Sequence, residues 1–210
     1  MLSDISLTLE PGSFHFLTGP SGSGKTTFLK LCFGELQATE GQVRLFDVDT
    51  HDMDRDDIAE ARQRIGMVHQ DCQFLDHLPL YENIGLPLTV AGRSMEDEAA
   101  NLNQLLNWVG LKDKVMAFPP ELSGGERQRA ALARAVITSP DVVLADEPTG
   151  NIDWEMSQRL LALLIELNKM GKTILVATHD LNVIRAAKAH VSVRVLRIAN
   201  SKLQLAGADL

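Results

Sequence analysis

Cysteine is scarce in this 210-residue chain, which contains only Cys32 and Cys72. Neither stands in a spacing typical of metal ligands, and two cysteines cannot form the disulfide framework of a small secreted domain. This scarcity excludes a disulfide-stabilised secreted class and indicates a protein of a reducing cytosol.

Long hydrophobic runs are also missing. No stretch approaches the roughly 18 to 20 apolar residues that a membrane-spanning helix needs. Asp4 and Glu10 interrupt the N-terminus, where a signal peptide needs an apolar core. We therefore expect any contact with a membrane to come through a partner.

An excess of positive charge is absent as well. The chain has 20 Lys and Arg against 28 Asp and Glu, a formal net charge of -8, so it lacks a large cationic field that would attract nucleic acid. We do not expect a nucleic-acid partner. With 45% hydrophobic and 23% charged residues, the composition is that of a globular protein with one sizeable core.

Apolar segments that alternate between strand and helix character predict a parallel α/β sheet. The predicted strands are residues 13–18, 65–69, 141–145 and 173–178, and the predicted helices between them include residues 26–33 and 156–170. The run 141–145 is apolar throughout, as in a parallel strand buried on both faces. Residues 191–205 predict two further short strands that turn at Asn200 and Ser201, a small antiparallel portion.

The segment from about residue 71 to residue 139 differs, because it contains no convincing strand. Helical periodicity appears over residues 95–109 and 126–137, and several prolines interrupt the rest. We interpret it as an inserted helical subdomain. The prediction is then a single domain over residues 1–210, with its core in residues 1–70 and 140–210.

A glycine-rich segment follows the first predicted strand and opens the first predicted helix, and it matches the pattern GxxxxGK[ST]. Its residues are Gly19, Pro20, Ser21, Gly22, Ser23, Gly24, Lys25 and Thr26, followed by Thr27. Glycines let backbone N–H groups point at phosphates, and the helix N-terminus adds a favourable dipole. The Lys25 ammonium would bind the outer phosphates, and the Thr26 hydroxyl would ligate Mg²⁺. The competing interpretation is a Gly/Ser-rich turn that contains lysine by chance.

Two carboxylates, Asp146 and Glu147, end the apolar strand 141–145. Ligands of open α/β folds bind at this edge of the sheet, and a carboxyl pair there needs a counter-charge. Asp146 would hold Mg²⁺ through its coordination shell, which leaves Glu147 to orient or deprotonate an attacking water. A solvated acidic strand end is the simpler alternative.

Gln70 and His179 each follow a predicted strand, so both can reach the same edge. Taken alone, a glutamine or histidine at a strand end is more often a surface residue than a functional one. The residues themselves leave that alternative open.

Ser123, Gly124 and Gly125 form a turn at the start of the helix that runs to Ile137, which makes a second anion-binding helix end. The chain has only one lysine-bearing loop of the pattern above. The economical interpretation is that this second end completes a nucleotide site on another copy of the domain.

These elements, in this order, resemble the ATP-binding cassette (ABC) family, whose fold is that of P-loop NTPases, over essentially the whole chain. The resemblance implies ATP and Mg²⁺ as cofactors, with Thr26, Gln70 and Asp146 around the metal and Glu147 as catalytic base. Gln70 and His179 would sense the γ-phosphate. Residues 150–153, which include Asp153, correspond to the D-loop, and a homodimer would sandwich two ATP molecules head to tail.

Residues 16–19, 144–151 and 177–182 look most like the cell-division branch of this family. That likeness implies a membrane-protein partner, a place on the cytoplasmic face of the bacterial inner membrane, and control of cell-wall hydrolysis. The ATPase of a lipoprotein-release or macrolide-type exporter is the alternative, and a slowly hydrolysing ATP-dependent scaffold is another. Residues 72–83 would contact the membrane partner, although an ordinary surface loop would look the same.

The N-terminus departs from the family pattern. Cassettes of this kind have about twenty more residues there, with an aromatic side chain that stacks on adenine, whereas no Tyr, Phe or Trp precedes Phe14. Since such stacking is worth roughly 1–3 kcal/mol, its absence would weaken ATP binding about 5- to 150-fold. A start codon assigned too far downstream and a short cassette both fit this pattern, and we favour the first.

Overall fold

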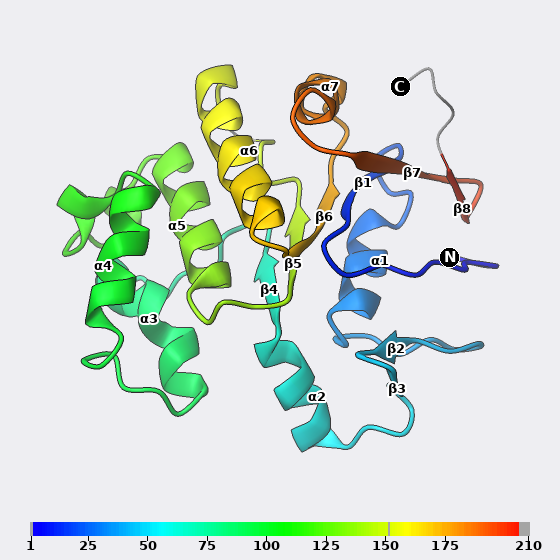
Figure 1. Ribbon diagram of the computed structural model, residues 1–210, viewed down its shortest axis with the longest axis horizontal. Helices are drawn as coiled ribbons and strands as arrows, with labels where there is room; N and C mark the ends of the chain where they lie inside the picture. The colour runs from blue at the N-terminus through cyan, green and yellow to red at the C-terminus, as the bar shows by residue number, and fades with distance from the viewer. Residues whose placement is uncertain (1, 151, 206–210) are drawn as a thin grey trace.

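A six-stranded sheet forms the centre of the computed structural model, which describes residues 2–150 and 152–205 (Figure 1). The strands are β1 (Phe14–Thr18), β4 (Ile65–Val68), β5 (Val142–Asp146), β6 (Thr173–Ala177), β7 (Val193–Ala199) and β8 (Lys202–Leu205). They lie in the order β4-β5-β6-β1-β7-β8. All neighbours are parallel except β7 and β8, which form the predicted antiparallel pair.

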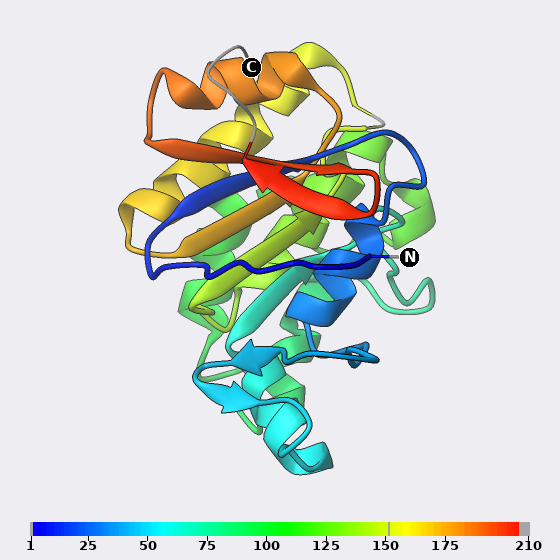
Figure 2. The ribbon, with the colours of Figure 1, turned by 90° about the vertical axis from the view of Figure 1, so that its right-hand side faces the viewer.

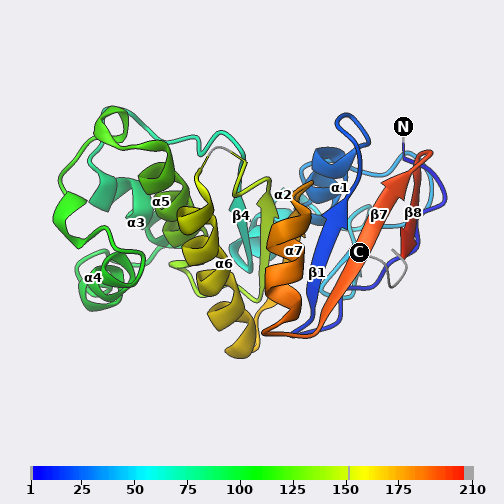
Figure 3. The ribbon, with the colours of Figure 1, turned by 90° about the horizontal axis from the view of Figure 1, so that it is seen from above.

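Both faces of the sheet are covered, which explains why its central strands are apolar throughout. Phe16 packs into one core and its neighbour Leu17 into the other, because successive side chains of a strand point to opposite faces. Helix α1 (Lys25–Cys32) covers one face, and α6 (Trp154–Lys169) and α7 (Leu181–Lys188) cover the other (Figure 3).

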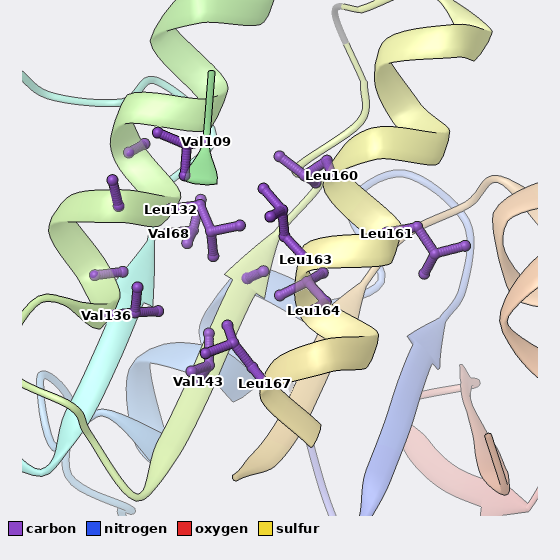
Figure 4. Packing of buried hydrophobic residues seen from close by; sticks show 14 of the residues in the cluster. Val68, Val109, Leu132, Val136, Val143, Leu160, Leu161, Leu163, Leu164 and Leu167 are labelled. Carbon is purple, nitrogen blue, oxygen red and sulfur yellow. The ribbon is translucent and has the colours of Figure 1, made fainter. Parts of the chain in front are cut away.

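Three helices lie between β4 and β5 in the sequence and form the predicted helical insertion (Figure 1). They are α3 (Leu80–Val90), α4 (Ala99–Trp108) and α5 (Gly124–Val136), with the 3-10 turns η1 (Lys112–Lys114) and η2 (Pro119–Glu121) before α5. Leu132 and Val136 of α5 point toward Leu164 and Leu167 of α6 across the strands (Figure 4). Within the described part of the chain, every helix is too short or too polar to cross a bilayer.

The predicted strands and the helix 156–170 are confirmed to within two residues, but other elements differ. The helix predicted over 95–109 begins only at Ala99, because Ser94 Oγ accepts the backbone N–H groups of Glu96 and Asp97 and holds a turn there. Helix α3 was missed because Pro87 lies inside it, and proline in a helix interior removes a backbone donor.

A small hairpin and a helix between α1 and β4 were also not predicted (Figure 2). The hairpin joins β2 (Arg44–Leu45) to β3 (Val48–Asp49), with positive φ at both turn residues, Phe46 and Asp47. Helix α2 (Arg55–Gln63) begins at a capping box in which Asp54 and Asp57 each accept the other's backbone N–H. Strands of two residues are too short for a periodic pattern, which explains why the sequence did not reveal them.

His15 on β1 predicts a loss of stability in acid. Its side chain is fully buried and neither ring nitrogen has a hydrogen-bond partner among the described residues. Burial lowers the pKa of His15, and the charge of Arg194 lowers it further. His15 therefore binds a proton more readily in the unfolded chain than in the folded protein. The free energy of unfolding falls as the pH drops below about 6.5.

We expect His15→Leu to reduce that acid sensitivity. Urea unfolding measures the free energy of unfolding at about pH 7.5 and about pH 5.5. The decrease between these two pH values should be smaller in His15→Leu than in the wild type, by on the order of 1 kcal/mol. The exposed His190 provides the matched control, since His190→Leu should leave the loss unchanged. An equal loss in the wild type and in His15→Leu would contradict this account.

Candidate functional site

The glycine-rich segment turns from the end of β1 into α1, and its conformation depends on glycine. Gly19, Gly22 and Gly24 all have positive φ, with values of 153°, 74° and 103°. A Cβ on Gly19 would lie 2.8 Å from the Ile198 carbonyl oxygen and 2.6 Å from Ser23 Oγ. The loop therefore has no room for a side chain at its first position.

The N-terminus of α1 is open toward this loop. Its N-cap, Gly24, offers no side-chain hydrogen bond, and the first turn contains no acidic residue. The first backbone N–H groups of a helix have no partner within the helix, so they are available to an anion. Ser23 Oγ is buried without a hydrogen-bond partner in the described structure, so this hydroxyl can form a hydrogen bond to a bound ligand.

Lys25 lies between the loop and the carboxylates. Its Nζ donates to the Gly19 carbonyl oxygen at 3.0 Å and is 3.5 Å from Glu147 Oε1. Both side chains are nearly enclosed, with 10% and 12% of their surface exposed, so solvent screens this ion pair less than a surface pair. The ammonium is thereby held at the mouth of the loop.

Thr26 and Asp146 form a pair suited to a hard cation. Thr26 Oγ1 donates to Asp146 Oδ2 at 2.6 Å, and the other carboxylate oxygen, Oδ1, is buried without a hydrogen-bond partner among the described residues. Hydroxyl and carboxylate oxygens are the ligands that Mg²⁺ prefers, so the residues present fit that ion. Across residues 2–150 and 152–205 no group of three or more His, Cys, Asp or Glu could hold a metal. The ion would therefore need further oxygens from nucleotide or water.

Glu147 follows Asp146 in a left-handed backbone conformation, with φ of 45°. Such a conformation costs a residue other than glycine roughly 1–2 kcal/mol, and it is stabilised here by the hydrogen bond from the Glu147 N–H to the Ala177 carbonyl at 2.8 Å. His179 Nδ1 lies 3.0 Å from both carboxylate oxygens. A hollow of about 450 Å³ opens beside Glu147 and His179. The carboxylate is thus held between Lys25 and His179 at the edge of an open space.

The parallel strands explain why these residues meet. Val68 pairs with Ala145, Asp146 pairs with Ala177, and Ala177 pairs with Leu17, so the C-terminal ends of β4, β5, β6 and β1 lie at one edge. Gln70 comes two residues after β4 and is exposed at that edge, where its backbone oxygen accepts a hydrogen bond from Gln128 Nε2 at 3.4 Å.

Ser123, Gly124 and Gly125 are placed elsewhere. Ser123 is the N-cap of α5, and its backbone N–H donates to Glu126 Oε2 at 2.8 Å, which lowers the pKa of that carboxyl. Ser123 and Gly124 are exposed. Helix α5 packs on β4, whereas α1 packs on β5 and β6, so within one chain this turn and the glycine-rich loop belong to different parts of the fold (Figures 1 and 3).

Asp153 caps α6, since its Oδ1 accepts the Met156 N–H at 2.8 Å. It ends the segment predicted as the D-loop, in which Asn151 lies outside the described residues. Met156 also contacts the turn of α5: a Cβ on Gly125 would lie 3.0 Å from Met156 Cγ, and the buried Arg129 donates to Met156 Sδ. Neither Arg129 nor Met156 was predicted from the sequence, because their spacing fits no known ligand pattern.

Comparison with known proteins shows that this chain is similar to nucleotide-binding subunits. Residues 2–150 match the family model described as ABC transporter. The chain is 40% identical over 202 residues to the cell division ATP-binding protein FtsE of Escherichia coli K12, covering 96% of this chain and 89% of that protein. It is 39% identical over 190 residues to FtsE of Bacillus subtilis, covering 90% of this chain and 83% of that protein.

Two solved structures of the ATP-binding cassette MJ0796 have the same fold. The first is a dimer in a post-hydrolysis state bound to ADP and Pi, with a TM-score of 0.87 and 33% identity over 97% of this chain and 90% of that one. The second, also dimeric, has a TM-score of 0.88 and 34% identity over 97% of this chain and 88% of that one. The α/β fold with its helical insertion is therefore confirmed.

Proposed function

This chain belongs to the ABC transporter family and is an ATP-hydrolysing subunit. From that premise we propose that it drives a complex of the FtsE–FtsX type at the inner membrane. The observation that supports the catalytic part of this proposal is the single edge at which Lys25, the Thr26–Asp146 pair, Glu147 and His179 meet. The chemistry of a nucleoside triphosphate with a divalent cation uses all of these groups together.

The residues have distinct roles in the proposed reaction. The loop amides and the Lys25 ammonium bind the phosphates, and Lys25 then exchanges its contact with Glu147 for a phosphate oxygen. Thr26 and Asp146, with Gln70, would hold Mg²⁺, which neutralises negative charge on the phosphates when bound. Glu147 accepts the proton of the attacking water, and the neighbouring His179 holds its carboxylate in place.

A second copy of the chain would complete each site. Ser123 and Gly124 are exposed at the N-terminus of α5, and α5 packs on a different strand from the helix that follows the glycine-rich loop. The dimeric MJ0796 structures support this arrangement, because they are built from cassettes of the same fold. We propose that the turn of one copy contacts the phosphates of ATP bound by the other.

A membrane protein resembling FtsX is the proposed partner, which would place this subunit on the cytoplasmic face of the inner membrane. Its contact would lie on residues 72–83, which connect the edge of the ATP site to α3. Leu75 in this segment is 43% exposed, so its side chain can be reached by a partner. The identity to FtsE proteins over most of both chains supports this partner over a lipoprotein-release or macrolide-type permease.

Photocrosslinking in cells tests the partner. A benzophenone amino acid at Leu78 or Tyr81 should capture a membrane protein of the FtsX type. The same probe at Val48, which is 47% exposed on strand β3 of the small hairpin, should not. Capture of an exporter permease would overturn the cell-division assignment, and no membrane-protein crosslink from any position between 74 and 83 would overturn the docking segment.

A further inference from the structure

The turn that follows Gln70 is held by Arg134, a half-buried arginine from the helical insertion. Arg134 on α5 donates from Nη1 to the Gln73 carbonyl at 2.8 Å and from Nη2 to the Cys72 carbonyl. Its guanidinium carbon also lies 4.6 Å above the centre of the Phe74 ring. Burial lowers the pKa of Arg134, although an arginine remains charged at any physiological pH. One side chain therefore contacts three successive residues of the turn.

The turn has a conformation that needs such support. Cys72 and Gln73 both have positive φ, 56° and 39°, and neither is glycine. Each left-handed residue of this kind is strained, and strained residues persist only where the surroundings hold them. The two carbonyl groups that Arg134 binds belong to these same two residues.

A second anchor fixes the far end of the segment. Asn83 is fully buried, and its side chain accepts the Leu75 N–H at 2.8 Å and donates to the carbonyls of Leu75 and Leu78 at 3.0 and 2.8 Å. Asn83 therefore fixes residues 75–78 from α3, which leaves the stretch between Gln70 and Phe74 without a contact from this side chain. Arg134 acts on that stretch.

The same helix contacts Gln70 itself. Gln128 of α5 donates to the Gln70 carbonyl at 3.4 Å, and Arg134 follows six residues later on α5. We propose that Arg134 is a positioning residue, which holds the strained Cys72–Gln73 backbone so that the Gln70 side chain is presented to the nucleotide. This inference rests on the proposed ATPase function, and it assigns Arg134 a role that acts through the backbone of residues 72 and 73.

A double-mutant cycle between Arg134 and Gln70 tests the inference. Arg134→Met should lower kcat roughly 10- to 100-fold, the range expected when a group near the reacting atoms is misplaced, and should leave the Kd for ADP unchanged within about twofold. In a Gln70→Ala background the same substitution should lower kcat by less than about twofold, because the group that Arg134 positions is already absent. An equal loss in both backgrounds would overturn the proposal.

Arg64→Met is the matched control, since Arg64 also stacks on a phenylalanine, at 3.6 Å from the Phe46 ring centre, and pairs with Asp141 away from the ligand edge. It should leave kcat unchanged. If Arg134→Met does not fold, Arg134→Lys replaces it. Lysine keeps the charge but cannot present the planar fork, so kcat should again fall in the wild-type background and not in Gln70→Ala.

Hydrogen exchange provides a readout that does not depend on ATP hydrolysis. In Arg134→Met the amides of residues 72–74 should exchange at least about tenfold faster than in the wild type, while those of α1 should not change. Unchanged exchange over residues 72–74 would overturn the inference by itself. A wild-type protein without ATPase activity would overturn the proposed function instead, and the exchange experiment would still decide whether Arg134 holds the turn.

Discussion

Glu147→Gln should bind ATP and hydrolyse it about 10²- to 10⁴-fold more slowly, the contribution expected of a positioned general base. The amide keeps the size of the carboxylate and can still contact His179, which lies 3.0 Å from both oxygens of Glu147. It cannot accept the proton of the attacking water. Because hydrolysis would be blocked after binding, the variant should accumulate as an ATP-bound dimer.

Single-turnover hydrolysis together with the molar mass in the presence of ATP checks this result. Glu155→Gln is the matched control, since Glu155 is 78% exposed and pairs with Arg159 on the surface of α6. It should leave both measurements unchanged. Hydrolysis by Glu147→Gln at the wild-type rate would remove Glu147 from the mechanism.

Lys25→Met should lose ATP affinity about 10- to 150-fold, because a hydrogen bond to a charged group contributes about 1.5–3 kcal/mol. The Lys25 side chain is only 10% exposed, and its Nζ already donates to the Gly19 carbonyl at 3.0 Å. The ammonium is therefore held where the phosphates would bind. Methionine fills the space of the lysine stem without the charge. The fold should persist, since Lys25 contributes to none of the buried apolar clusters.

Titration calorimetry with ATP and Mg²⁺ measures the loss. Lys30→Met on the same helix provides the control, because Lys30 pairs with Glu35 at 2.7 Å on the surface. Its affinity for ATP should equal that of the wild type. An unchanged Kd in Lys25→Met would show that the loop does not bind the phosphates.

The main features of the site were predictable because they depend on strand order alone. Asp146, Glu147 and His179 follow apolar runs, and parallel strands bring the residues after such runs to a common edge. The sequence also predicted the glycine-rich loop in its strand-to-helix context, and the structure shows why Gly19 permits no side chain.

The contacts that hold the site together were not predictable. Arg134 lies 61 residues along the chain from Gln73, whose carbonyl it binds. Asn83 also acts on backbone carbonyls, which carry no sequence signal. The left-handed backbone of Glu147 could not be foreseen either, because it arises from its hydrogen bond to Ala177 on the neighbouring strand. Tertiary contacts of this kind override local preference, as Pro87 inside α3 also shows.

We propose that each ATP site is shared between two copies of the chain. Lys25→Met inactivates the loop and leaves the turn of α5 intact, whereas Ser123→Arg fills that turn and leaves the loop intact. At an ATP concentration well below the Kd of Lys25→Met, each variant alone should be nearly inactive, because every site in its homodimer lacks one half. A mixed dimer contains one complete site, made from the loop of one copy and the turn of the other.

The most direct measurement is the ATPase rate of an equal mixture of the two variants. The shared site predicts recovery to roughly a quarter of the wild-type rate, because about half of randomly paired dimers are mixed and each carries one of its two sites complete. A mixture no more active than either variant alone, with mixed dimers demonstrated by mass, would contradict the shared site.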